Sequence, residues 1–206
     1  MLQQTQVTRV VARYGEWLER WPTPHALAGA SAADVIRAWQ GLGYNRRALD
    51  LQRAAQRIAE SGWPADLTEL PGVGRYTADA VARFAFDAPV LPVDTNVARV
   101  LERSGARFGS ASAHALMDLG ATVCLARIPR CGVCPLARRC PSRGRRYEPL
   151  RKQSRFEGSF RQRRAGVLRL VAERPRRVAS VDREAAESLA RDGLVEMAGN
   201  LVRLPI

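Results

Sequence analysis

The most restrictive feature of the sequence is a group of four cysteines within seventeen residues, and the chain has no other cysteine. Their spacing is C-x6-C-x2-C-x5-C, formed by Cys124, Cys131, Cys134 and Cys140. Four thiolates on a short stretch suit either a zinc ion or an iron–sulfur cluster. A zinc ribbon has two C-x2-C pairs, whereas this segment has one. Clustered cysteines in a cytosolic chain favour a metal centre over disulfide bonds.

The net charge of the chain indicates which kind of molecule it binds. Thirty-three arginine and lysine residues against twenty aspartate and glutamate residues give a net charge of +13 and a pI of about 11.1. Lys152 is the only lysine, so arginine carries almost all of the positive charge. Such an excess favours binding to a polyanion, above all nucleic acid, and a solvated basic surface is the alternative explanation.

The sequence carries no sign of a membrane segment or an export signal. Met1 leads into a polar stretch, Gln3 to Gln6, with no basic region or apolar run behind it. No segment reaches the ~18 apolar residues that a membrane-spanning helix requires. We therefore expect a soluble, cytoplasmic protein without membrane contact.

Apolar residues recur at helical spacing through most of the first 140 residues, which predicts an all-α fold for this part of the chain. Proline and glycine separate the helices, as at Trp21-Pro22 and Gly41-Leu42-Gly43. No strand is expected before residue 190. The expected helices cover residues 3–20, 31–39, 45–60, 75–86, 95–105 and 112–126, with a short one that ends at Pro71-Gly72.

The composition changes after the cysteines. Residues 142–160 are rich in arginine and poor in aliphatic side chains, which indicates a basic linker. Helices are expected at 161–173 and 183–191, followed by a hairpin around Gly199-Asn200. Two helices and a hairpin outline a small winged-helix-like α+β module over residues 161–206.

A second motif lies at Leu70-Pro71-Gly72-Val73-Gly74. Glycines on both sides of a valine permit a tight turn between two helices, with backbone angles that other residues avoid. The amides at the start of the next helix then form a site for a phosphate oxygen. This is the logic of a helix-hairpin-helix, which binds the DNA backbone without reading sequence. An ordinary corner between two helices is the alternative.

Asp94 follows a proline-rich turn in the sequence Val93-Asp94-Thr95-Asn96. Aspartate is a favoured residue at the start of a helix, so a purely structural role explains its position. The functional explanation is a fixed anion beside a developing positive charge. Cleavage of a base from its sugar passes through an oxocarbenium-like state, which such an anion stabilises.

Together these residues resemble the helix-hairpin-helix DNA glycosylase superfamily, and within it the A/G-specific adenine glycosylases of the MutY type. The resemblance covers residues 1 to about 140. The order and spacing of its motifs make it specific. They are Met1-Leu2-Gln3-Gln4-Thr5-Gln6-Val7, Gly41-Leu42-Gly43-Tyr44, the turn at residues 70–74 with Arg75-Tyr76-Thr77-Ala78, and Ala115-Leu116-Met117-Asp118-Leu119-Gly120-Ala121.

The resemblance implies a role for each matching position. Asp94 is the aspartate that stabilises the oxocarbenium ion, and the four cysteines hold a [4Fe–4S] cluster. The remaining positions contact the DNA or a flipped adenine, which must leave the stack to be reached. They are Leu2, Gln4 and Tyr44, inserted into the duplex; Gly72, Val73, Gly74 and Arg75, at the hairpin; and Tyr76 and Asn96, in the base pocket.

Position 76 separates two types of glycosylase. The endonuclease III type, which also cuts the strand, has a Schiff-base lysine there, and this chain has Tyr76. A lyase needs an amine nucleophile, so no efficient lyase activity is expected. Thr95 instead favours the endonuclease III type, because that type has threonine at this position and the adenine family has glycine. A thymine or uracil glycosylase therefore stays open as an alternative.

The chain departs from the family pattern at both ends. The catalytic glutamate of the family lies two residues before the methionine of the M-L-Q-Q-T motif, and here that methionine is Met1. We expect a start codon assigned too late or a fragment, and a genuinely shortened protein is the alternative. Base excision should be nearly silenced in the chain as it stands, since general acid catalysis contributes ~10²–10⁴-fold. The 66 residues after Cys140 are too few for the family's 8-oxoguanine-reading domain.

The predicted function is a monofunctional glycosylase that removes adenine mispaired with guanine or 8-oxoguanine in base excision repair. Its partner is duplex DNA with a mismatch or an oxidised guanine, and the protein is expected to be a nucleoid-associated monomer. A non-catalytic binder of damaged DNA and a zinc-dependent winged-helix regulator are the alternatives. The expected divisions are 1–110, the glycosylase core; 111–141, the cluster region; 142–160, the linker; and 161–206, the winged-helix-like module.

Overall fold

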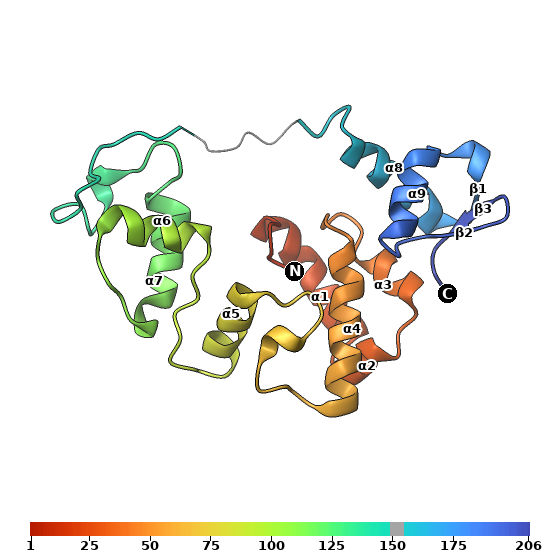
Figure 1. The fold of residues 1–206 in the computed structure, drawn as a ribbon, viewed down its shortest axis with the longest axis horizontal. Coiled ribbons are helices and arrows are strands. Elements are labelled where there is room, and N and C mark those ends of the chain that lie inside the picture. The colour runs from red at the N-terminus through yellow and green to blue at the C-terminus, as the bar shows by residue number, and fades with distance from the viewer. Residues whose placement is uncertain (149–154) are drawn as a thin grey trace. The chain divides into compact units, whose positions relative to one another are not determined.

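The computed structural model describes residues 1–148 and 155–206, and among these the chain forms two compact units (Figure 1). The first unit comprises residues 1–65, 70–72 and 155–206. The second unit comprises residues 66–69 and 73–148. Each has its own apolar core. No helix among the described residues is long and apolar enough to cross a membrane.

Four helices open the first unit: α1 (Val7–Arg20), α2 (Pro24–Ala28), α3 (Ala32–Ala38) and α4 (Arg46–Ser61). Tryptophans dominate their core, with Trp17 edge-on to Trp21 at 4.7 Å and to Trp39 at 5.5 Å between ring centroids. Such edge-to-face pairs are favourable beyond the area they bury. The side chain of Ser31 accepts a hydrogen bond from an amide in the first turn of α3, as its position in the sequence predicts.

The sequence prediction missed one element here and misplaced another. Helix α2 was not predicted because it has five residues and only one of them, Leu27, is buried. Its signal was present, since Thr23 caps the helix and Pro24 occupies its first turn. The first helix begins at Val7 and not near residue 3, because Gln4 has a φ of 55°, which a right-handed helix cannot contain.

The C-terminal part of the first unit contains two helices and a three-stranded sheet. The elements are α8 (Phe160–Glu173), β1 (Arg176–Arg177), α9 (Arg183–Arg191), β2 (Glu196–Ala198) and β3 (Leu201–Arg203). Strand β3 lies between β1 and β2 and is antiparallel to both, with Met197 opposite Val202. Strand β1 contradicts the expectation of no strand before residue 190. Its two residues are too few to show an alternating pattern.

This C-terminal module shares an apolar core with the N-terminal helices. Ile36 of α3 and Leu49 of α4 are buried in the same cluster as Leu168 of α8 and Leu189 of α9. The guanidinium Nε of Arg37 also donates to the carbonyl of Ala172 at 3.0 Å. The module is therefore packed on α3 and α4 and is not an independent appendage.

We predict that Leu168→Ala will destabilise the first unit as a whole. Leu168 is 1% exposed in the shared core, so its truncation should cost about 2–5 kcal/mol. Hydrogen exchange of the amides of α3 and α4 should then accelerate together with that of α8. Leu201→Ala, at a position that is 45% exposed in the same module, is the control and should change neither. Unchanged hydrogen exchange in α3 and α4 would show that the C-terminal module does not stabilise the N-terminal helices.

The second unit contains three helices joined by short turns: α5 (Arg75–Ala85), α6 (Thr95–Ser104) and α7 (Ala113–Asp118). The helix expected over 112–126 is interrupted, because α7 passes into a π-helical turn at Leu119–Val123 just before Cys124. Such turns are rare and concentrate at functional sites. The core is small, and Cys124 and Leu136 of the cysteine segment pack against Val97, Val100 and Leu116.

Candidate active site and cysteine pocket

Asp94 is the residue immediately before α6, and its carboxylate is held by the first turn of that helix. One oxygen, Oδ1, accepts from the amides of Asn96 at 2.9 Å and Val97 at 2.7 Å. The other, Oδ2, accepts from the side-chain amide of Asn96 at 2.9 Å. The capping role that the sequence suggested is therefore confirmed. It also fixes the position of a negative charge.

The side chain of Asn96 links Asp94 to a partly buried network of hydrogen bonds. Its Oδ1 accepts from Nη2 of Arg99 at 2.8 Å. The same Arg99 donates from Nη2 to the carbonyl of Gly120 at 2.8 Å and from Nε to the carbonyl of Cys124 at 2.8 Å. A continuous chain of hydrogen bonds thus joins the Asp94 carboxylate to the backbone of the first cysteine.

Gly120 is closely packed against this network. A Cβ at this position would lie 2.9 Å from the Cβ of Asn96 and 3.0 Å from its carbonyl carbon and oxygen. Real Cβ contacts are essentially never so short, so any larger residue would have to move α6. The glycine is therefore required by space and not by its backbone angles.

We predict that Gly120→Ala will lower both stability and base release. Overpacking of this kind costs about 1–3 kcal/mol, and displacement of Asn96 would loosen the hold on Asp94. Thermal unfolding and single-turnover kinetics measure the two effects. Gly109→Ala is the matched control, since its added Cβ meets nothing within 4 Å and its φ of −89° suits alanine. Equal behaviour of the two variants would contradict the prediction.

Tyr76 lies in the first turn of α5, and the charge of Asp94 affects the pKa of its phenol. Partial burial, followed by the negative charge of Asp94, raises the pKa of the Tyr76 phenol above its usual value. Asn96 and Tyr76, which the resemblance assigned to the base pocket, and Asp94, which it assigned to catalysis, all belong to the second unit.

All four cysteines line one pocket in the second unit, as the spacing of the motif predicts. Among the described residues, however, no three histidine, cysteine, aspartate or glutamate side chains converge closely enough to hold a single metal ion. Hydrogen bonds anchor two of the thiols. Cys140 lies 3.3 Å from the carbonyl of Arg103, and the amide of Gly144 donates to the sulfur of Cys131 at 3.3 Å.

Arg103 of α6 forms the wall of this pocket and was missed by the sequence analysis. Its guanidinium donates to the carbonyls of Leu125 and Ala126 at 2.8 and 2.6 Å and lies 3.7 Å from the sulfur of Cys124. The opposite face covers the ring of Tyr147 at 3.6 Å from its centroid. The one sequence signal was its place four residues after Arg99, which puts both side chains on the same face of α6.

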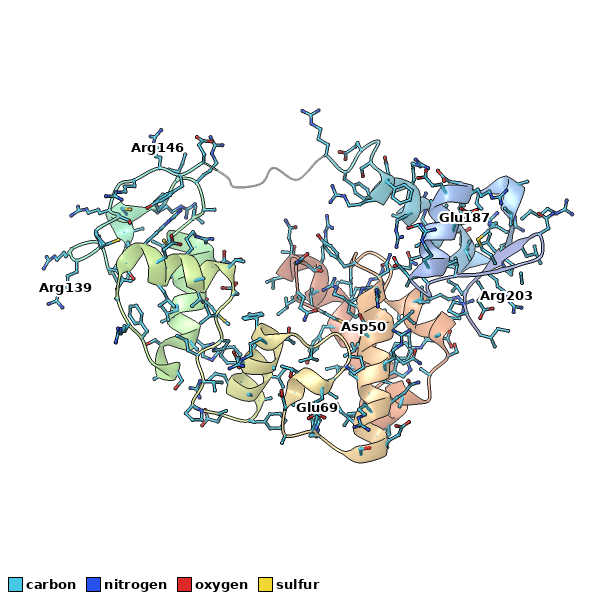
Figure 2. All side chains as sticks on the ribbon, viewed as in Figure 1. Asp50, Glu69, Arg139, Arg146, Glu187 and Arg203 are labelled. Atoms are coloured by element: carbon cyan, nitrogen blue, oxygen red, sulfur yellow. The ribbon has the colours of Figure 1, made fainter. Side chains whose placement is uncertain are left out.

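The exposed surface of the cysteine segment is basic. Arg139 and Arg146 extend from it into solvent (Figure 2). Arg127, Arg130 and Arg138 are also exposed. Arginine donates several hydrogen bonds in a fixed fork that matches phosphate oxygens, so this surface suits the backbone of a nucleic acid.

The turn between the 3₁₀ turn Leu67–Glu69 and α5 has the expected tight geometry. Gly72 has a φ of 73°, and a Cβ there would lie 2.7 Å from the Cβ of Asp50 on α4. Gly74 is the N-cap of α5 and has no side chain with which to cap the helix. A helix that starts at a glycine after a tight turn suits the approach of an anion to its first turn.

The residues assigned to insertion into DNA lie on two segments of the first unit. Leu2 and Tyr44 are 59% and 52% exposed. Gln4 and Tyr44 both have positive φ, 55° and 47°, which is uncommon outside glycine. The hydroxyl of Thr5 donates to the carbonyl of Leu42 at 3.0 Å, so the two segments are joined.

Residues 1–121 match the family described as HhH-GPD superfamily base excision DNA repair protein. The fold is similar to that of a solved endonuclease III, trapped as a covalent intermediate with DNA. The TM-score is 0.61 with 27% identity, over 68% of this chain and 78% of that chain. The helical fold, the hairpin and the fixed carboxylate define a base excision DNA glycosylase of the helix-hairpin-helix class.

The chain is 41% identical to the adenine DNA glycosylase of Mycolicibacterium smegmatis, over 97% of this chain and 83% of the relative. It is 42% identical to that of Mycobacterium tuberculosis, over 95% of this chain and 79% of the relative. The chain therefore belongs to the adenine DNA glycosylase family. The alignment with the first relative spans 244 positions against 206 residues here, so that relative has segments without a counterpart in this chain.

Proposed function

We propose that the chain hydrolyses the N-glycosidic bond of adenine mispaired with guanine or 8-oxoguanine, with Asp94 as its catalytic carboxylate. The observation that carries the proposal is the fixed position of Asp94, whose two oxygens accept three hydrogen bonds. Release of a base leaves positive charge on the sugar in an oxocarbenium-like state. A carboxylate that is already in place stabilises this charge without reorganising.

Asn96 and Tyr76 are the proposed lining of the pocket for the flipped adenine. The amide nitrogen of Asn96 is bound to Asp94 and its oxygen to Arg99, so its orientation is determined. Tyr76 carries its proton at neutral pH as any phenol does, and burial and Asp94 raise its pKa further. A neutral phenol can donate to or accept from the edge of a base, and its ring can stack on an extruded one.

The enzyme is proposed to be monofunctional. Strand cleavage by a lyase needs an amine that forms a Schiff base. The endonuclease III type, which is bifunctional, has its Schiff-base lysine at position 76. This chain has a tyrosine there. Lys152, the only lysine of the chain, lies outside the described residues.

DNA is proposed to bind at two places. The amides at the start of α5, with Gly72, Val73, Gly74 and Arg75, bind a phosphate without reading sequence. Arg75 supports this role because its side chain is 87% exposed. Leu2, Gln4 and Tyr44 are proposed to enter the duplex beside the target base and help to extrude it.

A [4Fe–4S] cluster is the metal centre that fits the cysteine pocket. A zinc ion would need its ligands to converge at ~2.3 Å from one point. Each cysteine of a four-iron cluster binds a different iron, so the thiols can surround a wider space. The four cysteines that line one pocket support the proposed cluster. When bound, the cluster would supply the cross-link that holds the arginine-bearing segment in place.

The C-terminal module is proposed to be a winged helix packed on the glycosylase core. The support is its topology: α8, β1, α9 and then the β2–β3 hairpin, with β3 central in the sheet. The divisions 1–110, 111–141, 142–160 and 161–206 remain proposals. Part of the basic linker, residues 149–154, lies outside the described residues.

The substrate is tested with short duplexes carrying adenine opposite 8-oxoguanine, guanine or thymine, on the chain extended at its N-terminus to carry the glutamate that the resemblance implies as general acid. We expect alkali-labile sites only in the first two, and no strand scission before alkali treatment. Duplexes with thymine or uracil opposite guanine are the controls for the alternative bases. Cleavage of these in preference to adenine would overturn the assignment, and scission without alkali would overturn the monofunctional mechanism.

A further inference from the structure

Arg47, in the first turn of α4, binds both segments that carry the insertion residues. Its Nη1 donates to the carbonyls of Met1 at 3.1 Å and Gln3. On the other segment, Nη2 donates to the carbonyl of Gly43 at 3.0 Å, and weaker contacts of 3.4 Å reach Leu42 and Tyr44. Nη2 also donates to the hydroxyl of Thr5 at 2.8 Å.

These acceptors require an arginine. All are uncharged oxygens that surround one guanidinium from several directions, and none of the bonds from Arg47 goes to a carboxylate. Arginine presents five donors in a rigid plane, whereas the lysine ammonium has three donors on a flexible stem. The guanidinium also lies 5.2 Å from the ring of Trp39 and 5.5 Å from that of Tyr44.

The bonds from Arg47 flank the two unusual backbone positions of this region. Gln4 and Tyr44 have φ values of 55° and 47°, which L residues rarely adopt without support. The carbonyl of Gln3 precedes Gln4, and those of Gly43 and Tyr44 lie on both sides of the Tyr44 α-carbon. Such conformations persist where the surroundings over-determine them.

We infer that Arg47 is a positioning residue that holds Gln4 and Tyr44 in the shape that enters the duplex. The inference rests on the proposed function and deepens it. A wedge whose backbone is set before DNA arrives loses less conformational entropy on binding, so more of the binding energy is available to extrude the base.

The test uses the chain as it stands and needs no catalytic turnover. A duplex carries 2-aminopurine in place of the target adenine, opposite 8-oxoguanine, and its fluorescence rises when the base leaves the stack. Arg47→Met should lower the extruded fraction about tenfold, the effect of losing one or two hydrogen bonds to a charged group. Arg46→Met is the matched control, because it removes the same charge from the adjacent, exposed residue.

Arg46→Met and Arg47→Met should bind undamaged duplex with equal affinity, since both lose one positive charge. Equal extrusion by the two variants would overturn the inference. Arg47→Lys keeps the charge and replaces the methionine variant if that variant fails to fold. Weak extrusion of the base by Arg47→Lys supports a requirement for the planar guanidinium, and full extrusion overturns the inference. Absence of any fluorescence change with the unmodified chain would instead overturn the proposed function.

Discussion

Asp94→Asn is expected to slow adenine release by about 10²–10³-fold, the usual effect of removing one electrostatic contact to the transition state. Asparagine keeps the shape of the side chain and caps helices well, so α6 should remain folded. The loss is therefore assigned to the charge and to the one hydrogen bond from the Asn96 side chain that an asparagine amino group cannot accept, and not to unfolding of α6. Single-turnover release from the duplex with adenine opposite 8-oxoguanine measures it in a chain extended at its N-terminus to carry the glutamate that the resemblance implies as general acid, with circular dichroism as the check on folding.

The chain offers a matched control for this substitution in Asp182. It also caps a helix, with its side chain accepting from the amide of Ala185 at 2.9 Å. Asp182→Asn removes a capping charge from α9 and should leave adenine release unchanged. A second readout is affinity for a duplex with a cationic pyrrolidine at the target sugar, which only Asp94→Asn should weaken. If adenine leaves Asp94→Asn at an undiminished rate, the proposed role of the carboxylate is wrong.

The sequence identified the parts of the fold and site that depend on local patterns. Helices α4, α5, α6 and α9 lie within about two residues of their expected ranges, because apolar periodicity and capping residues mark them. The grouping of the four cysteines followed from spacing alone. Asp94 was found twice, as a helix cap and as the residue matched by the family resemblance.

The sequence did not reveal the arginines that connect these parts. Arg99 binds carbonyls 21 and 25 residues away, and Arg47 binds one 46 residues away. A backbone carbonyl is present at every residue, so no pattern of side chains marks which ones will converge on a guanidinium. Tertiary packing selects them, and only the three-dimensional structure reveals the choice.

Cys134→Ser is expected to abolish cluster binding and with it the ordered cysteine segment. Regular structure between residues 125 and 148 is limited to the 3₁₀ turn Cys131–Val133. Within residues 125–148, the side chain of Leu136 packs against the small apolar core of the second unit. Because the segment has little regular structure, the proposed metal centre would supply much of its order, as structural metal sites do in other small domains. Iron and sulfide content, visible absorption and limited proteolysis after the arginines of the segment measure the loss.

The control for this substitution is Ser142→Ala, which alters the lining of the same pocket without removing a thiol. It should keep the full iron content and the protease resistance of the unmodified chain. The network from Cys124 through Arg99 to Asp94 extends the prediction, because disorder of the segment would displace the Cys124 carbonyl, one of the acceptors that orient Arg99. Cys134→Ser should therefore also lose base release, by at least tenfold for about 1.4 kcal/mol of lost orientation. Zinc without iron in the purified chain, or full iron content in Cys134→Ser, would contradict the cluster assignment.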